Sequence, residues 1–329
     1  MRKLGYALLL LLSACTGSLE PPLPALVAAG GQEEVRFYRA RDLQGGTAAP
    51  VAAWNTPGLQ DLAYSNPAQR LYLLFPDRVE AYDTSGFTEA SVPKGTPAVQ
   101  ALPAGADCTG GYLRLGRNRL LAHCPGAARA FLWSLDGSGS LEEADLTGLP
   151  PGARLALLPQ GTLDLLAYLT QEALGFRPAQ DPGGSPRLEK PLDPSPSQAP
   201  YDLRADRDRE ELLGLAPTAT EVRLYTLKGE SLQSRKVLGD FPQASRLALD
   251  PVGGTVVYGR GFQVLLPRES PVQQPFRTYT AGLVGQDGYL YLAAGESLEV
   301  WDLVPSPPLQ VRGLSLGFSP HSLAFLPVE

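Results

Sequence analysis

Short apolar runs, separated by Gly, Pro and Asp, recur along nearly the whole chain. Typical runs are Arg70–Phe75, Glu211–Leu215 and Tyr289–Ala293. They lack the periodicity of three to four residues that marks an amphipathic helix, and such short runs between turn residues are typical of strands in antiparallel meanders. The pattern therefore predicts an all-β fold.

One motif recurs within this pattern: an apolar residue, a variable residue, an apolar residue, an aromatic residue and then a polar or charged one. Clear copies are Val35–Arg39, Val79–Asp83 and Leu298–Asp302. The fourth position of the motif falls at residues 38, 82, 133, 176, 225, 265 and 301. Their mean spacing of about 44 residues is the period expected for four-stranded propeller blades. Two strand-like runs precede each copy, so we expect the motif to mark the fourth strand of each blade.

The two ends of the chain are expected to share one blade. After Trp301 the chain has two more strand-like runs, Gly313–Phe318 and Ser322–Leu326, and Glu34–Arg39 can supply the missing outer strand. Such sharing closes the ring without leaving an open first or last sheet. We predict a β-propeller over residues 34–329, with seven four-stranded blades and an N-terminal outer strand that completes the last blade. Six or eight blades stay open, because the fourth copy of the motif is degraded.

Across roughly residues 34–329 the chain resembles the WD-repeat and YVTN-type propellers. Trp301-Asp302 and Tyr82-Asp83 match the dipeptide that ends a WD repeat, whereas the Gly-His partner of that Asp is absent. The resemblance implies an architecture, a rigid disc whose loops bind partners or ligands, and not a WD-repeat identity.

The N-terminus has the pattern of an export signal. Two cations precede an apolar run from Leu4 to Leu12, which is too short for a membrane-spanning helix of about 20 residues. Leu12–Cys15 resembles the lipobox of bacterial lipoproteins, which implies that residues 1–14 are a signal peptide and that Cys15 is lipidated. The alternative is an ordinary secretory signal with an incidental cysteine.

Lipidation would place the protein outside the cytoplasm, facing the periplasm or the cell surface and held to a membrane by its N-terminal lipid. Residues 15–33 would then form the lipidated cysteine and a flexible tether, because residues 16–33 are rich in Pro, Ala and Gly. The sequence does not predict which membrane or leaflet holds the anchor.

Two further cysteines flank a predicted hairpin. The strands are Gly111–Leu115 and Leu120–Cys124, with a turn at Gly116–Arg119, and Cys108 lies just before the first strand. Folding about the turn brings Cys108 and Cys124 to the same end of adjacent strands. In an oxidising compartment such a pair is expected to form a disulfide. The alternative is two separate buried thiols.

Composition and charge exclude several functions. The formal net charge of −6 gives no electrostatic footprint for nucleic acid. With His123 and His321 as the only histidines, the chain is poor in zinc ligands, and we predict no metal and no cofactor. Asp202, Asp206 and Asp208 alternate with arginines and lack the Gly and Glu of a calcium loop, so we expect a hairpin turn there.

No arrangement of residues predicts catalysis. Gly313–Gly317 spells the G-x-S-x-G pattern of a hydrolase, with His321 nearby. It falls in a predicted strand, whereas that pattern needs a strand–turn–helix context. The recurrent aromatics Tyr38, Tyr82 and Tyr225 are expected to pack between blades.

We therefore predict a non-catalytic, monomeric propeller that acts in the cell envelope as a protein-binding or scaffolding module, with an envelope protein as its partner. The alternatives are an extracytoplasmic propeller enzyme of the lactonase or glycosidase type, or a binder of a glycan or small ligand. Residues of such an enzyme would lie on different blades, and carboxylates on the central axis could hold a metal. A flat face without a deep pocket would favour the scaffold.

Overall fold

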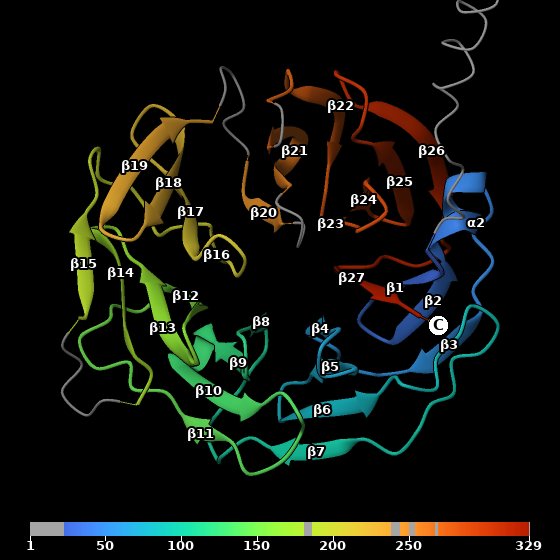
Figure 1. Cartoon of the computed structure of the whole chain (residues 1–329), viewed down its shortest axis with the longest axis horizontal. Helices are drawn as coiled ribbons and strands as arrows, with labels where there is room; N and C mark the ends of the chain where they lie inside the picture. Colours follow the sequence, from blue (N-terminus) through green and yellow to red (C-terminus); the bar gives the residue numbers. More distant parts are fainter. Residues whose placement is uncertain (1–22, 181–185, 238–243, 250–253, 267–268, 329) are drawn as a thin grey trace, which may run out of the picture.

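The computed structural model describes residues 23–180, 186–237, 244–249, 254–266 and 269–328. Seven antiparallel sheets are arranged around a common centre, as Figure 1 shows. The predicted all-β propeller with seven blades is confirmed. One short α-helix, α2 (Ala40–Gly45), and one 3₁₀ turn, η2 (Pro125–Ala127), are present in this part of the chain.

The blades are numbered here in chain order of their outer strands, and each is given from its innermost strand outwards. Blade 1 contains β27 (Ser322–Pro327), β1 (Ala25–Gly30), β2 (Glu34–Arg39) and β3 (Ala52–Asn55). Blade 2 contains β4 (Asp61–Ser65), β5 (Arg70–Leu74), β6 (Arg78–Asp83) and β7 (Ala98–Ala101). Blade 3 contains β8 (Tyr112–Leu115), β9 (Arg119–Cys124), β10 (Arg129–Ser134) and β11 (Glu142–Glu143). Blade 4 contains β12 (Arg154–Gln160), β13 (Leu163–Leu169), β14 (Ala173–Pro178) and β15 (Leu188–Pro191).

Blades 5 and 7 follow the same plan, whereas blade 6 has three strands among the described residues in place of the predicted four. Blade 5 contains β16 (Asp202–Asp206), β17 (Glu211–Pro217), β18 (Val222–Lys228) and β19 (Ser231–Lys236). Blade 6 contains β20 (Arg246–Leu249), β21 (Thr255–Leu266) and β22 (Gln273–Thr278), with β21 unusually long at 12 residues. Blade 7 contains β23 (Ala281–Val284), β24 (Tyr289–Ala294), β25 (Ser297–Asp302) and β26 (Leu309–Ser315).

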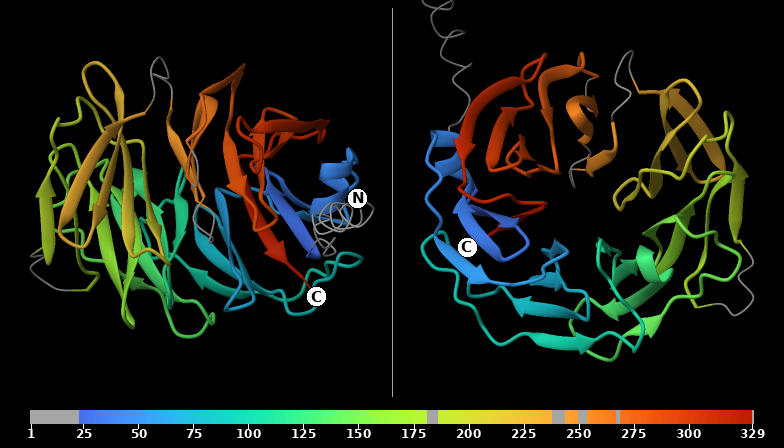
Figure 2. Two further views of the ribbon diagram at one scale, coloured as in Figure 1. Left: turned by 45° about the horizontal axis from the view of Figure 1, so that its top comes forward. Right: turned by 180° about the vertical axis from the view of Figure 1, so that it is seen from behind.

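The innermost strands form a closed ring. Each one contacts the innermost strand of the next blade, in the order β27, β4, β8, β12, β16, β20, β23 and back to β27. Both views in Figure 2 show the blades radiating from this centre. Radial repetition of this kind leaves only short, protected sheet edges.

The recurrent motif lies one strand further inwards than expected. Six of its seven copies fall on the third strand of a blade, as with Tyr82 on β6, and a fourth strand follows each of these six; the copy at residue 265 lies on the long strand β21 of blade 6. These outer strands are short and partly exposed, as in Ala98–Ala101 and Leu188–Pro191. A strand that buries neither face has no need of an apolar pattern, so the sequence gives little sign of it.

Closure takes more of the N-terminus than a single outer strand. Blade 1 joins β27 to β1, β2 and β3, and β1 pairs with both β27 and β2. The expected tether over residues 15–33 is therefore wrong for Ala25–Gly30, where every residue is buried. Small residues suit this tight position, since a Cβ on Gly30 would lie 2.6 Å from Leu62 Cδ2. The signal peptide, residues 1–14, and Cys15 lie outside the described residues.

The apolar core fills the spaces between adjacent blades. Tyr82 packs against Trp54, with ring centroids 4.9 Å apart, in the space between blades 1 and 2. Tyr38, Tyr82 and Tyr225 are each at most 3% exposed. Their expected role in packing between blades is consistent with this burial, and each such side chain contributes about 1.5–3 kcal/mol.

The hairpin β8–β9 carries a disulfide between Cys108 and Cys124. Their Cα atoms are 4.3 Å apart, and both residues are fully buried. The chain turns tightly beside them at Gly111, where a Cβ would lie 2.7 Å from the Cys108 carbonyl oxygen. The cross-link fixes the loop that leads into β8, one of the innermost strands.

Within the described part of the chain, no helix has the length and apolar character needed to cross a membrane.

Candidate functional site

A cavity of about 1060 Å³ occupies the centre of the ring. Residues of all seven innermost strands line it. Its volume lies at the upper end of the range of about 300–1,000 Å³ that is typical of small-molecule sites. The molecule therefore has a deep central pocket in place of a flat face.

The innermost strands share a register that places polar side chains around this cavity. At the first position of the register, the side chain faces the next blade. The residues there are Ser322, Asp61, Tyr112, Arg154, Asp202, Arg246 and Ala281, from β27 round to β23. The following residue is Leu in every strand except β23, where it is Gly282.

Four of these first-position residues connect their blade to the next one. Ser322 Oγ accepts a hydrogen bond from the Leu62 N–H at 3.1 Å. Three further bonds follow the same rule: Leu113 N–H to Asp61 at 2.8 Å, Leu155 N–H to the Tyr112 hydroxyl at 2.9 Å, and Leu247 N–H to Asp202 at 3.0 Å. Because edge N–H groups need a partner when they are buried, these side chains stabilise the ring.

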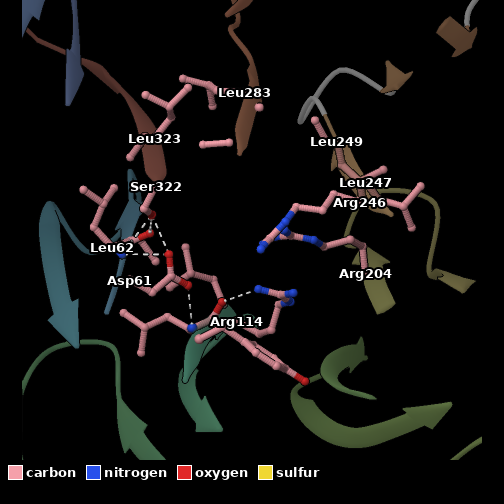
Figure 3. A pocket seen from close by; sticks show the side chains of 18 of the residues that line it. Asp61, Leu62, Arg114, Arg204, Arg246, Leu247, Leu249, Leu283, Ser322 and Leu323 are labelled. Carbon is pink, nitrogen blue, oxygen red and sulfur yellow. Dashed lines mark hydrogen bonds between the residues drawn. The ribbon is translucent and has the colours of Figure 1, made fainter. Parts of the chain in front are cut away.

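Four consecutive blades each direct an arginine towards the cavity. Arg154 on β12 and Arg246 on β20 occupy the first position, whereas Arg114 on β8 and Arg204 on β16 lie two residues after it. Figure 3 shows Arg204 and Arg246 reaching into the cavity from one side, with Arg114 below them and Asp61 opposite. The positive charge is gathered at the end of the cavity where the innermost strands begin.

Asp202 balances part of this charge. It is 4% exposed, and its carboxylate accepts hydrogen bonds from Arg114 Nη2 at 2.7 Å and Arg204 Nε at 3.2 Å. Burial alone would raise its pKa, but Arg204 and Arg114, together with the Leu247 N–H, lower the pKa of Asp202 to about 2. Asp202 is therefore ionised at neutral pH and is a weak base.

The arginines differ in the partners that their guanidinium groups have within the protein. Burial and the neighbouring Arg204 lower the pKa of Arg114, and Asp202 only partly compensates. Arg154 donates from Nε to the Pro200 carbonyl oxygen at 3.0 Å. Arg246 is exposed in the cavity, and its guanidinium has no hydrogen bond or ion pair with any residue that the structure describes. Arg246 is thus the cation most available to a ligand.

The second carboxylate at this end, Asp61, also accepts hydrogen bonds from neighbouring groups. One of its oxygens accepts from the Leu62 N–H and the Ser322 hydroxyl, and the other accepts from the Leu113 N–H. Asp61 and Asp202 thus each hold a backbone N–H of another blade, which gives both carboxylates a role in closing the ring. Asp206, Arg207 and Asp208 also line the cavity, but at the far end of β16.

Most of the residues singled out from the sequence lie away from the arginines. Asp206 accepts from the backbone N–H groups of Asp208 and Arg209, as expected for a hairpin turn. The expected turn is wrong for Asp202, which begins the innermost strand β16 and is buried beside Arg114 and Arg204. Ser315 ends the outer strand β26 and is exposed, so the G-x-S-x-G pattern has no elbow geometry. His321 lines the cavity, and burial lowers its pKa although Asp61 opposes this.

Among residues with assigned positions, no group of three or more His, Cys, Asp or Glu side chains could hold a metal ion.

The arginine cluster itself was not predicted from the sequence. A signal was present, because Asp61, Arg154, Asp202 and Arg246 each precede a Leu at the start of an innermost strand. Only alignment of these strands in the ring reveals that the four arginines converge.

No protein-family model and no curated protein matches the chain. Solved structures with the same fold include a protein assigned as a 6-phosphogluconolactonase from Bacteroides uniformis, with 12% identity and a TM-score of 0.65 over 93% of this chain and 100% of that one. Another is the periplasmic gluconolactonase PpgL of Pseudomonas aeruginosa, with 14% identity and a TM-score of 0.63 over 93% and 99%. A third is the Cps50 (Swd1) propeller domain of Myceliophteria thermophila, with 15% identity and a TM-score of 0.56 over 81% and 88%.

These findings confirm the resemblance to propellers of the WD-repeat and YVTN type at the level of fold. They correct the expectation of a non-catalytic scaffold. That expectation relied on the absence of a recognisable group of reactive residues, and a flat face would have favoured it. The ring instead encloses a cavity with converging cations, and the similar structures include a protein assigned as a 6-phosphogluconolactonase and a gluconolactonase. The sequence misled because the cavity residues are dispersed over seven strands and match no local motif.

Proposed function

We propose that this protein is an extracytoplasmic propeller enzyme of the lactonase type, which binds a small organic anion in its central cavity. The observation that carries the proposal is the convergence of Arg114, Arg154, Arg204 and Arg246 on one end of that cavity. Guanidinium groups bind carboxylates and phosphates strongly because they donate several charge-assisted hydrogen bonds in a planar array.

Lactone hydrolysis suits such a site. Water adds to the carbonyl carbon, the ring C–O bond breaks, and the ring oxygen takes a proton to leave a hydroxy acid, which ionises in water. Negative charge first develops on the carbonyl oxygen and then remains on the product carboxylate. Exposed cations such as Arg246 stabilise both species, and Asp202 orients Arg114 and Arg204 beside it.

Three observations support a location outside the cytoplasm. The N-terminus has the pattern of an export signal, Cys108 and Cys124 form a disulfide, and one structure of the same fold is that of a periplasmic protein. Lipidation at Cys15 and anchoring by that lipid belong to the same proposal, on the strength of the Leu12–Cys15 sequence.

The test is hydrolysis of glucono-δ-lactone and 6-phosphogluconolactone, followed by acid release in weak buffer and corrected for the spontaneous rate. Wild-type protein is expected to accelerate one of these lactones, and Arg246→Gln is expected to lower kcat/KM at least tenfold. The matched control is Arg235→Gln, because Arg235 is exposed on the outer strand β19. An absence of acceleration together with an absence of phosphate or gluconate binding would refute the proposal.

A further inference from the structure

Beside Asp61, on the side of the cavity away from the arginines, two adjacent innermost strands, β23 and β27, line a wall and contribute no charged side chain. On β23 the lining residues are Ala281 to Val284, and on β27 they are Ser322 to Phe325 and Pro327. Neither strand contributes a charged side chain to the lining, whereas β8, β12, β16 and β20 each contribute one arginine or more. The cavity therefore has a cationic side and an apolar side.

On this wall Leu323 is partly exposed to the cavity, unlike the Leu at the same register position of the other strands. In the other strands the Leu after the first register position is buried, with at most 4% exposure: Leu62, Leu113, Leu155, Leu203 and Leu247. On β27 the equivalent Leu323 is only half-buried. Figure 3 shows Leu323 close to Leu283, which is also half-buried.

Two substitutions in the repeating pattern create this wall. Gly282 replaces the usual Leu on β23, and Tyr258 of blade 6 fills the space beside it. A Cβ added to Gly282 would lie 2.7 Å from Tyr258 Cε1, so a larger residue does not fit there. Leu283 then stands at a position that holds Ala on β4, β12, β20 and β27. The same position holds Arg114 on β8 and Arg204 on β16, so β23 places a large apolar side chain where the ring elsewhere has Ala or a cavity-facing arginine.

Half-exposed leucines in a concave site favour a ligand that removes their surface from water. A polyhydroxylated sugar acid would instead bury its hydroxyl groups against carbon atoms, which costs free energy because those groups lose their hydrogen bonds to water. We infer that this cavity prefers an anion with an apolar body, such as an alkyl or aryl carboxylate or phosphate, or the lactone of such an acid, and that sugar lactones are its poorer substrates. This inference rests on the proposed function, since it assumes that the arginines hold the anionic group.

The test compares two phosphate monoesters of equal charge by isothermal titration calorimetry. Hexyl phosphate offers an apolar body, and glucose 6-phosphate offers a polyhydroxylated one. Wild-type protein is expected to bind hexyl phosphate at least tenfold more tightly. Leu283→Ala and Leu323→Asn are each expected to reduce that preference at least threefold and to leave the affinity for glucose 6-phosphate unchanged.

Arg246→Gln is expected to weaken binding of both esters, and Arg235→Gln to weaken neither. Equal affinities, a preference for the sugar phosphate, or a preference that both leucine variants retain would overturn the inference while leaving anion binding intact. If neither ester binds, the proposed function fails as well. A melting temperature for each variant identifies a loss of fold, and the comparison in wild-type protein does not depend on any variant.

Discussion

Asp202→Asn separates the charge of this carboxylate from its shape. The side chain is 4% exposed and contacts Arg114 and Arg204 as well as the Leu247 N–H of the next blade. Asn can still accept a hydrogen bond from Leu247, but it carries no charge. The variant therefore leaves two arginines at the cavity without their anionic partner.

The pKa of Asp202 sets the magnitude and the pH range. It falls from 3.8 to about 2, because Arg204, Arg114 and the Leu247 N–H outweigh burial, which alone would raise it. At 1.36 kcal/mol per pH unit, the ionised form contributes about 2 kcal/mol to the free energy of unfolding at neutral pH. A carboxyl whose pKa is lower in the folded state contributes fully above its unfolded value, so most of this contribution is lost as the pH falls from about 4 to about 2.

Urea unfolding of wild type and Asp202→Asn, followed by tryptophan fluorescence from pH 7 to pH 2, measures this contribution. We expect the variant to be less stable by about 3 kcal/mol at pH 7, where a buried ion pair is broken, and by about 1 kcal/mol near pH 2. Asp208→Asn is the matched control, since Asp208 is exposed in the turn after β16 and should change stability by less than about 0.5 kcal/mol. A difference between wild type and Asp202→Asn that is the same at both pH values would refute the reasoning.

Three further predictions concern the rest of the chain. Replacing Cys108 and Cys124 with Ser removes a cross-link between residues 16 apart in sequence, and the chain-entropy model predicts that the free energy of unfolding falls by about 3 kcal/mol. Urea unfolding without reductant measures the difference from wild type, and equal stabilities would contradict the prediction. Leu71→Ala empties a fully buried position and should cost about 2–5 kcal/mol in the same assay, whereas Leu309→Ala, at a residue 60% exposed, should cost less than about 0.5 kcal/mol. Cys15→Ser should abolish incorporation of labelled fatty acid in bacteria that process lipoproteins and release the protein from membranes, and retention of label by the variant would exclude Cys15 as the lipidation site.

The sequence predicts the ring because the apolar core of each blade repeats. The third strand of a blade is buried on both faces, so its apolar and aromatic positions recur as in Val79–Asp83 and Leu298–Asp302. The outer strands carry no such constraint and are poorly visible in the sequence. β1 is missed for the opposite reason, because its Ala-rich sequence resembles a linker although all of its residues are buried.

The cavity could not be predicted in the same way. Arg154 and Arg246 are separated by 92 positions in the chain, and the Leu that follows each of them does not by itself mark a site. Their convergence depends on the closure of the ring and on a register that all innermost strands share. Fold and site are thus specified at different levels, the first by local periodicity and the second by three-dimensional alignment.

That register also explains why the arginines lie where they do. At four junctions the first-position side chain accepts an N–H from the next innermost strand, and so stabilises the ring. Arg154 and Arg246 occupy the same position but can only donate, so their junctions forgo this contact. Evolution commonly tolerates a local loss of this kind where a side chain serves binding. The junction at Ala281 of β23 also lacks this bond, because the Ala side chain has no polar atom. Of the three junctions without the bond, two supply cations to the cavity and the third lies on its uncharged side, so all three place cavity-lining groups where the other four junctions place a group that closes the ring.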